Sequence, residues 1–323
     1  MSKNIFVTRK IPEVGLQMLR DKGYAVDIFE EDRLPTQEEI IEFLQAKPYD
    51  AVITLLTDKI DSKVFDASPA TKIFSNYAMG FDNLDIVEAK NRGIVVTNTH
   101  GDYGGDVAEH TMAFILGLTT RMVEADQFVR DGKYTGWSPM NFIGLDLKDK
   151  VLGLIGVGSI GSRVAEHAYK GFGLKVVYYD VKRTPNIEEE CRAEYFDSVE
   201  EVLKRADFVS LHVPLLDSTH HLINAERLAV MKKTAFLINT SRGPVVDELA
   251  LVDALQKGTI RGAGLDVFEF EPKVSEALLT MPNVILTPHI ATARESARND
   301  MSKLAAQNII DFFETGKATF PVN

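Results

Sequence analysis

Short apolar runs alternate with amphipathic segments along the first hundred residues. Strands alternating with helices are typical of a parallel α/β sheet, and the run 51–56 is almost continuously apolar, as expected of a strand buried on both faces. Thr36, followed three positions later by Glu39, matches a capping box and predicts a helix start. The pattern therefore predicts a small βα unit of flavodoxin-like character. The predicted strands span residues 5–8, 25–29, 51–56, 72–76 and 94–97.

A second α/β pattern occupies the rest of the chain. Residues 106–130 predict one long helix with apolar residues on more than one face. The linker 131–147 follows and carries Trp137, the only tryptophan. Residues 294–313 predict a last helix, which comes too late to extend the second sheet and which we expect to return to the first domain. The intervening strand patterns span residues 151–155, 175–179, 208–213, 235–239, 262–267 and 284–286.

A glycine motif, Gly156-Val-Gly-Ser-Ile-Gly161, directly follows the first of these strands and opens a helix pattern. In such a turn Gly156 permits the tight bend, Gly158 lets the backbone approach a pyrophosphate, and Gly161 lets helix and strand pack closely. The helix N-terminus then faces the phosphates. A plain tight turn in an α/β fold is the alternative, but the flanking strands and an acid after the second strand favour a dinucleotide site.

Asp180 is that acid, 19 positions after Gly161. A carboxylate there can bind both hydroxyls of the adenine ribose, and it would repel the 2′-phosphate of NADP. Lys182 and Arg183 follow closely and would favour that phosphate, so they weaken the discrimination. We expect NAD as the cofactor, as NADH in the reducing direction, with NADP less favoured.

Length, charge and cysteine content narrow the class of protein. A chain of 323 residues suggests two domains, and a net charge of −11 argues against nucleic acid or an anionic membrane as a partner. The single cysteine, Cys191, excludes an internal disulfide and fits a reducing compartment. No secretory signal or long apolar run is visible, so we expect a cytoplasmic protein. Neither H-E-x-x-H nor Cys-x-x-Cys occurs, so we expect no metal.

Three polar residues, Arg242, Glu271 and His289, follow predicted strands in the second half of the chain. Ligands of open α/β sheets bind outside the carboxyl ends of the strands. There an arginine can grip a substrate carboxylate and polarise the adjacent carbonyl. A histidine can exchange the hydroxyl proton, and a carboxylate can hold the imidazole and favour its charged form. Each residue alone is equally compatible with a surface ion pair, a loop or a cap, and spacing does not show that they converge.

The chain resembles the D-2-hydroxyacid dehydrogenase family along essentially its whole length. The resemblance implies two Rossmann-like α/β domains with parallel sheets, of which the substrate domain is discontinuous. It places residues 1–99 and 292–323 in a flavodoxin-like substrate domain and residues 100–291 in the dinucleotide-binding domain. The matching segments are the glycine motif, His212-Val-Pro-Leu215, Asn239-Thr-Ser-Arg-Gly243, Gly264-Leu-Asp-Val-Phe268 with Glu271-Pro272, and Thr287-Pro-His-Ile290.

The resemblance also implies roles for individual residues. Arg242, Glu271 and His289 would be catalytic, and the N–H groups of Met79 and Gly80 would hold the substrate carboxylate. The implied cofactor contacts are Gly156, Gly158, Ser159, Ile160, Gly161, Asp180, His212, Val213, Pro214, Thr240, Ser241, Arg242, Asp266 and His289, with Asp266 near the nicotinamide carboxamide. The implied substrate contacts are Leu55, Ala78, Met79, Gly80, Arg242 and His289.

Within the family, residues 136–139 and 142–147 look most like the glyoxylate/hydroxypyruvate reductase branch. We therefore expect a homodimeric enzyme that reduces glyoxylate or hydroxypyruvate with NADH to the D-2-hydroxyacid. A D-lactate or 3-phosphoglycerate dehydrogenase is an alternative, as is an NAD(H)-sensing co-regulator of the same fold. Two departures bear on the choice: Ser159 stands where the family often has arginine, and residues 100–106 differ from the usual hinge beside the substrate.

Overall fold

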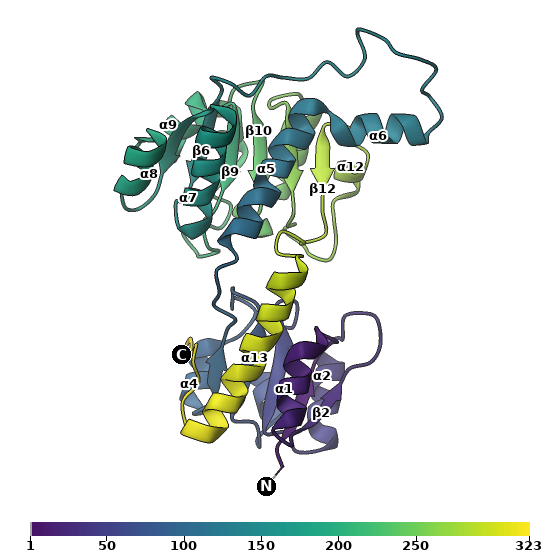
Figure 1. Cartoon of the computed structure of the whole chain (residues 1–323), viewed down its shortest axis with the longest axis vertical. Helices are drawn as coiled ribbons and strands as arrows, with labels where there is room; N and C mark the ends of the chain where they lie inside the picture. Colours follow the sequence, from purple (N-terminus) through teal and green to yellow (C-terminus); the bar gives the residue numbers. More distant parts are fainter. Residues whose placement is uncertain (1) are drawn as a thin grey trace. The chain divides into compact units, whose positions relative to one another are not determined.

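The computed structural model describes residues 2–323, which form two compact units. Unit 1 comprises Met1–Asp102 and Ala293–Asn323, and unit 2 comprises Tyr103–Thr292. Each unit is an α/β domain built on a parallel sheet, with five strands in unit 1 and seven in unit 2 (Figure 1). The predicted fold class is confirmed, including a first domain assembled from both ends of the chain.

Unit 1 has the strand order β2-β1-β3-β4-β5, the order of flavodoxin-like sheets. Its central strands are buried, as their apolar sequences predict. The strands are β1 (Asn4–Val7), β2 (Ala25–Ile28), β3 (Ala51–Leu55), β4 (Ile73–Tyr77) and β5 (Val95–Thr97). The helices are α1 (Glu13–Asp21), α2 (Gln37–Ala46), α3 (Ser62–Ala67), α4 (Ile86–Asn91) and α13 (Glu295–Thr315).

The last helix, α13, belongs to unit 1 as expected and packs against α1 and β4. Gly15 permits the close approach of α1, because a Cβ there would lie 2.1 Å from the carbonyl oxygen of Ser302. The Ser302 hydroxyl accepts a hydrogen bond from the Gly15 N–H at 3.2 Å and donates one to the Pro12 carbonyl at 2.6 Å. A glycine–serine contact therefore anchors the end of the chain to its beginning.

Unit 2 has the strand order β12-β11-β10-β9-β6-β7-β8. The chain order reverses at β6, and ligands of such sheets bind at this switch point, outside the carboxyl ends of the strands. The strands are β6 (Val151–Ile155), β7 (Lys175–Tyr179), β8 (Glu194–Tyr195), β9 (Phe208–Leu211), β10 (Phe236–Asn239), β11 (Gly262–Leu265) and β12 (Val284–Leu286). The α-helices are α5 (Gly104–Thr120), α6 (Met122–Arg130), α7 (Ser159–Glu166), α8 (Pro185–Cys191), α9 (Val199–Arg205), α10 (Ala225–Val230), α11 (Glu248–Gln256) and α12 (Glu276–Leu279).

The prediction of one helix over residues 106–130 is wrong, because the helix breaks at Arg121. This residue has a left-handed backbone, with φ 56° and ψ 34°, and separates α5 from α6. The hydroxyls of Thr119 and Thr120 donate to carbonyls one turn earlier, and the Arg121 guanidinium binds Glu124 at 2.9 and 2.6 Å. The apolar periodicity continues through the break, so the pattern alone does not reveal it.

The two helices differ in how their apolar residues are covered. Those of α5, including Phe114 and Ile115, are buried inside unit 2 against its sheet. In α6 no residue is buried, and Met122 and Val129 are more than half exposed. A long segment leads from α6 to β6 (Figure 1). Within it Trp137 is 84% exposed. Across residues 2–323 no helix combines the length and apolarity needed to cross a membrane.

Candidate active site

The glycine turn joins β6 to α7 and is closed on its protein side. Gly156 has a φ of +90°, and a Cβ there would lie 2.8 Å from the carbonyl group of His212. A Cβ at Gly161 would lie 2.5 Å from the Gly156 carbonyl oxygen. At Gly158, by contrast, an added Cβ meets nothing within 4 Å. The turn is therefore packed where it touches the sheet and open where a pyrophosphate would approach the main chain, so these residues fit a dinucleotide.

Asp180 fastens the same turn. It directly follows β7, the neighbour of β6, and its carboxylate accepts hydrogen bonds from the N–H groups of Val157 at 2.6 Å and Lys182 at 3.2 Å. An ionised carboxylate has about four acceptor sites, so capacity remains for ribose hydroxyls. The neighbouring Arg183 forms a two-pronged pair with Glu188 of α8, at 3.1 and 2.6 Å. Its guanidinium is therefore engaged by a carboxylate.

His212 supports the turn from β9. Its N–H donates to the Ile155 carbonyl at 2.8 Å, and its Nε2 lies 2.9 Å from the Ser210 hydroxyl. Burial of the ring lowers the pKa of His212 to about 3, so the imidazole is neutral at physiological pH. Of the next residues, Val213 is half-buried and Pro214 is exposed. The segment can therefore offer main chain to a cofactor, whereas the His212 ring is a packing group.

Arg242 lies in the turn that follows β10. The buried side chain of Asn239 shapes this turn, because it accepts from the N–H and hydroxyl of Ser241 at 3.0 and 2.8 Å and donates to the Arg242 carbonyl at 2.9 Å. A Cβ at Gly243 would lie 1.9 Å from the Phe268 carbonyl oxygen, so the turn rests directly on the loop after β11. Arg242 itself is half-buried, and its Nη1 donates to the Ser241 carbonyl at 2.9 Å.

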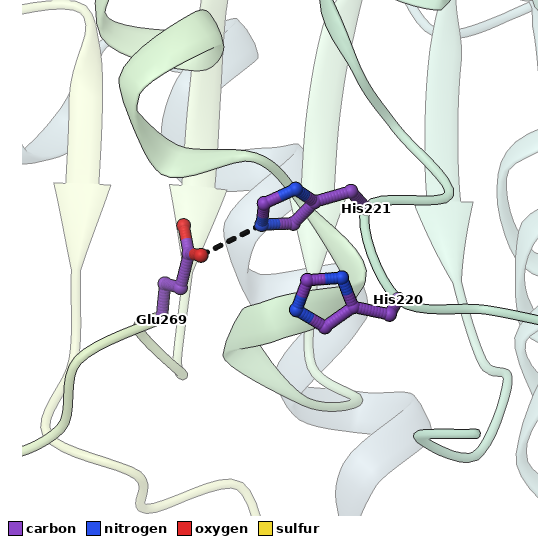
Figure 2. A group of neighbouring side chains, drawn as sticks. All are labelled: His220, His221 and Glu269. Atoms are coloured by element: carbon purple, nitrogen blue, oxygen red, sulfur yellow. Dashed lines mark hydrogen bonds and ion pairs between the residues drawn. The ribbon is translucent and has the colours of Figure 1, made fainter. Parts of the chain in front are cut away.

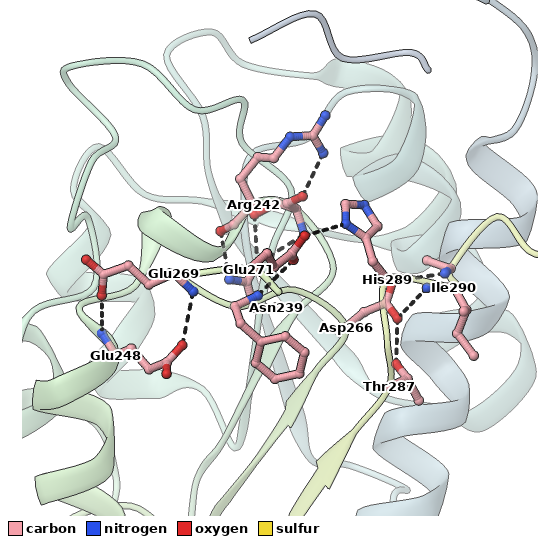
Figure 3. Close-up of polar contacts among 12 residues, drawn as sticks. Asn239, Arg242, Glu248, Asp266, Glu269, Glu271, Thr287, His289 and Ile290 are labelled. Carbon is pink, nitrogen blue, oxygen red and sulfur yellow. Dashed lines mark hydrogen bonds and ion pairs between the residues drawn. The ribbon is translucent and has the colours of Figure 1, made fainter. Parts of the chain in front are cut away.

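Glu271 and His289 meet in the loops after β11 and β12. The His289 Nδ1 lies 3.1 Å from one oxygen of Glu271, and the other oxygen accepts from the Phe268 N–H at 3.0 Å. Each side chain is 27% exposed, so the pair is accessible to a small molecule. Because β10, β11 and β12 are parallel neighbours, Arg242 lies at the same edge of the sheet (Figure 3). The structure thus gathers at one edge three residues that lie far apart in the sequence.

Asp266 organises the loop that carries His289. Its carboxylate is 1% exposed and accepts from the Thr287 hydroxyl at 2.5 Å and from the N–H groups of Ile290 at 2.8 Å and Ala291 at 2.9 Å. Its carbonyl accepts from the His289 N–H at 2.8 Å. His289 has a φ of 55°, a conformation that costs a non-glycine residue about 1–2 kcal/mol. The Asp266 contacts hold it there (Figure 3).

The charge of Asp266 is stabilised where it lies. Burial raises its pKa, but hydrogen bonds from His110, Thr287 and the two loop amides oppose this, and the pKa ends below the ordinary aspartate value. The His110 Nε2, on α5, is 3.5 Å from the carboxylate and 3.1 Å from the Thr287 hydroxyl. Asp266 is therefore an ionised, buried anchor of the loop. The sequence indicates Asp266 as a cofactor contact and does not indicate His110 as its partner.

In unit 1, the segment Ala78–Gly80 follows β4, and its three carbonyl groups are all bonded. Within residues 2–323 the N–H groups of Met79 and Gly80 donate to no other group. Main-chain donors left open in this way form a nest that suits a carboxylate. The resemblance indicates Met79 and Gly80 but not Asn76 and Asn98, whose side-chain amides bond the carbonyls of this segment. The carbonyl bonds are Thr99 N–H to Ala78 at 3.0 Å, the Asn98 amide to Met79 at 2.7 Å, and the Asn76 amide to Gly80 at 2.9 Å.

Leu55, the expected apolar wall, is half-buried at the end of β3 in the same unit. Its N–H donates to the buried Asp58 carboxyl group at 2.7 Å, and its carbonyl accepts from Asn83 at 2.9 Å. Burial raises the pKa of Asp58, although hydrogen bonds from Leu55 and Thr8 oppose the change. The strand end is thus fixed by polar groups behind it.

Known proteins match this chain over nearly its whole length. The profile of the family described as D-isomer specific 2-hydroxyacid dehydrogenase, NAD binding domain, matches residues 112–291. The glyoxylate reductase of Thermococcus litoralis is 46% identical over an alignment that covers 100% of this chain and 96% of the relative.

Solved structures extend the likeness to three dimensions. A protein from Thermus thermophilus superposes with a TM-score of 0.92 at 38% identity, covering 99% of this chain and 100% of its own. The NADPH-dependent glyoxylate/hydroxypyruvate reductase of Sinorhizobium meliloti, in complex with NADP and malonate, superposes with a TM-score of 0.84 at 33% identity, covering 100% and 97%. The profile spans more than half of the chain and the relatives span nearly all of it: the chain belongs to the family of D-isomer specific 2-hydroxyacid dehydrogenases.

Proposed function

We propose that this protein reduces glyoxylate with NADH, and that hydroxypyruvate is its second substrate. The observation that carries the proposal is the His289–Glu271 pair, 3.1 Å apart, at the strand ends where Arg242 also lies. An acid–base group and a guanidinium at one sheet edge suit the reduction of a carbonyl next to a carboxylate. Relatives named glyoxylate reductase, 43–47% identical over nearly the whole chain, support glyoxylate over other 2-oxoacids.

The cofactor would lie along the glycine turn, with its pyrophosphate at Gly158 and the N-terminus of α7 and its adenine ribose at Asp180. When bound, the nicotinamide supplies the hydride for the carbonyl carbon. His289 donates a proton from Nε2 to the carbonyl oxygen, because its Nδ1 is committed to Glu271. Glu271 stabilises the protonated imidazole, and Arg242 binds the substrate carboxylate.

A further part of the proposal concerns the nest in unit 1. We assign the open N–H groups of Met79 and Gly80 to the substrate carboxylate, since their three neighbouring carbonyls are bonded inward. Leu55 supplies an apolar surface at the end of β3 and offers no cation to a phosphate. A substrate with a small uncharged substituent fits these residues better than phosphohydroxypyruvate does.

We also propose a preference for NADH over NADPH. The Asp180 carboxylate would repel the 2′-phosphate of NADPH, and Arg183, one of the two cations that follow it, is paired with Glu188. The relative from Sinorhizobium meliloti is NADPH-dependent, so the fold itself does not exclude NADPH. The choice between NADH and NADPH therefore depends on the side chains around Asp180.

We propose, finally, that two copies of the chain form a homodimer through α6 and the segment 131–147. Their exposed apolar side chains include Met122, Val129, Trp137 and Met140. Large apolar side chains that are left exposed are candidates for a protein contact.

The deciding experiment measures kcat/KM for glyoxylate, hydroxypyruvate, pyruvate and phosphohydroxypyruvate at matched concentrations, followed by NADH absorbance. We expect glyoxylate first, hydroxypyruvate second and phosphohydroxypyruvate last. A preference for phosphohydroxypyruvate would overturn the substrate assignment. Binding of NADH without turnover of any of the four acids would favour an NAD(H)-sensing protein instead.

A further inference from the structure

A second polar cluster lies in unit 2, formed by His220, His221 and Glu269 (Figure 2). The two histidines follow β9 in a turn, and Glu269 lies in the loop after β11, 48 positions beyond His221 along the chain. One ligand atom from each residue lies within 4.8 Å of the other two. The sequence gives no hint of this cluster, because adjacent histidines and a distant glutamate match no familiar metal spacing.

The backbone places both rings on one side. Adjacent residues of a strand point to opposite faces, and those of a helix diverge by about 100°. His221 instead has a left-handed φ of 49°, and its N–H donates to the Pro244 carbonyl at 2.8 Å. The two rings stack with centroids 4.0 Å apart, and both face the Glu269 carboxylate (Figure 2). The turn therefore presents two imidazoles to a single acceptor group.

Glu269 is held in place as metal-binding carboxylates usually are. One oxygen lies 2.7 Å from the His221 Nε2, and the other accepts from the Glu248 N–H at 2.9 Å. The buried Glu248 carboxylate in turn accepts from the N–H groups of Glu269 at 3.0 Å and Ser275 at 3.1 Å. Such bonds orient a ligand from behind. A second carboxylate also adds negative charge behind the cluster, which favours a cation.

We propose that His220, His221 and Glu269 bind a divalent transition-metal ion of the Zn²⁺ or Co²⁺ class. Two imidazole nitrogens and one carboxylate oxygen form a ligand set that suits these ions and not Mg²⁺ or Ca²⁺, which prefer oxygen ligands. Ligand atoms about 2.0–2.2 Å from an ion lie roughly 3–3.5 Å apart. The three ligand atoms lie within 4.8 Å of one another and the two rings are stacked, so binding requires the side chains to draw closer and the rings to turn.

The ion takes the place of the proton between His221 and Glu269. The neutral imidazole binds the metal through Nε2 and carries its remaining hydrogen on Nδ1, while water fills the remaining coordination positions. His220 is exposed and Glu269 is largely buried, so the ion would lie at the surface of unit 2. It would link the turn after β9 to the loop after β11, and metal binding should therefore stabilise the fold.

The test uses the full chain without a polyhistidine tag and measures binding of Zn²⁺ by equilibrium dialysis and of Co²⁺ by visible absorption. We expect one ion per chain, with the Co²⁺ spectrum reporting nitrogen and oxygen ligands.

His220→Ala and Glu269→Gln should each weaken binding by at least ~10-fold. His220 is exposed, and the amide introduced by Glu269→Gln keeps an acceptor for the Glu248 N–H, so both variants should fold like the parent. Zn²⁺ should raise the unfolding temperature of the parent and not of His220→Ala.

His167→Ala is the matched control, because His167 is another histidine of unit 2 that lies outside the cluster. It should bind Zn²⁺ as the parent does. Equal binding by the parent and all three variants would place the ion elsewhere and overturn the proposal. Binding by none of them would also overturn it, and would leave the cluster as an ion pair between two loops.

Discussion

His289 combines a partly exposed ring with a fixed and strained backbone. Its φ of 55° is maintained because neighbours on both sides of it in the chain are tied to the buried Asp266 carboxylate. Strain of this kind persists where the surrounding structure over-determines it, and such positions cluster at active sites. The backbone therefore directs the ring towards Glu271, and this direction does not depend on the hydrogen bond between the two side chains. Backbone and side chain of His289 can therefore be tested separately.

The first prediction tests the side chain of His289 separately from its backbone. His289→Asn and His289→Ala should each lower kcat for glyoxylate reduction by at least ~10²-fold, the usual scale of general acid catalysis. Asparagine tolerates the left-handed backbone, so His289→Asn should also leave the unfolding temperature nearly unchanged. NADH binding, followed by fluorescence, serves as the control and should survive in both. Turnover within a few-fold of the parent would rule out His289 as the proton donor.

The second prediction is that Asp266→Asn weakens the loop that carries His289. One oxygen of the carboxylate would become an N–H donor facing the N–H groups of the loop, so the free energy of unfolding should fall by about 2 kcal/mol. The lowered pKa of Asp266 means that its stabilisation is present above about pH 4 and is lost as the carboxylate becomes protonated. Urea unfolding should therefore show the gap between parent and variant shrinking as the pH falls below about 4. A gap that stays constant down to about pH 2 would contradict this assignment.

The third prediction concerns the cofactor. Asp180→Asn removes the negative charge but keeps an oxygen that can accept the Val157 N–H. The ratio of kcat/KM for NADH to that for NADPH should fall at least ~10-fold, through weaker ribose binding and relief of repulsion from the 2′-phosphate. Glu188→Gln, which loosens Arg183, should move the ratio in the same direction by less. Equal efficiency with both cofactors in the parent would refute the proposed preference.

Some site residues could be predicted from sequence and others could not, for a physical reason. Arg242, Glu271 and His289 follow apolar runs, and in a parallel sheet every such position lies at the same edge. Asn98 and Asn239 act through hydrogen bonds to the main chain, which leave no pattern in the sequence. Contacts between distant segments, such as that of His110 with Thr287, depend on the packing of α5 and are equally invisible.

At the scale of elements, loops position the segment Ala78–Gly80 of unit 1, which we propose holds the substrate carboxylate. The loop after β5 reaches across to the loop after β4, where the buried Asn98 amide donates to the Met79 carbonyl at 2.7 Å. Asn98→Ala should free this carbonyl and allow the Met79 peptide group to rotate. Loss of one such bond corresponds to about 1.4 kcal/mol, so KM for glyoxylate should rise about 10-fold while kcat changes little.

The control for this prediction is Asn91→Ala, on the exposed end of α4 in the same unit. It should leave KM unchanged. KM for NADH should also stay constant in both variants, because the nest is proposed to bind the substrate and not the cofactor. An unchanged KM for glyoxylate in Asn98→Ala would mean that the nest does not hold the carboxylate.

The break between α5 and α6 shows where periodicity fails as a guide to elements. Apolar residues recur through Arg121 because α5 is covered by the sheet and α6 presents a second apolar face elsewhere. No glycine or proline marks the break, and Arg121 adopts the left-handed conformation that glycine usually supplies. The short strand β8, with two residues, escapes prediction because it carries no alternation to detect. Long elements with one consistent environment are predicted well.

At the scale of the whole molecule, unit 2 exposes large apolar side chains on α6 and in the segment 131–147. Met122 is 60%, Trp137 84% and Met140 73% exposed. Because α5 is already buried within unit 2, the long helix expected from sequence is not what a partner would cover. The surface proposed for a partner is α6 and the segment 131–147.

The last prediction follows from this surface. Light scattering of the parent at micromolar concentration should give twice the chain mass of 35.9 kDa. Trp137→Lys combined with Met140→Lys places two charges where apolar contact is proposed, and should shift the protein towards the monomer by making their burial costly. Both side chains are exposed, so the double variant should keep the far-ultraviolet circular dichroism of the parent.

The matched control is Val181→Lys, which replaces an apolar residue that is 85% exposed in the loop after β7, outside the proposed interface. It should remain dimeric. A parent that scatters as a single chain of 35.9 kDa would refute the dimer, and a double variant that stays dimeric would place the interface elsewhere on the molecule.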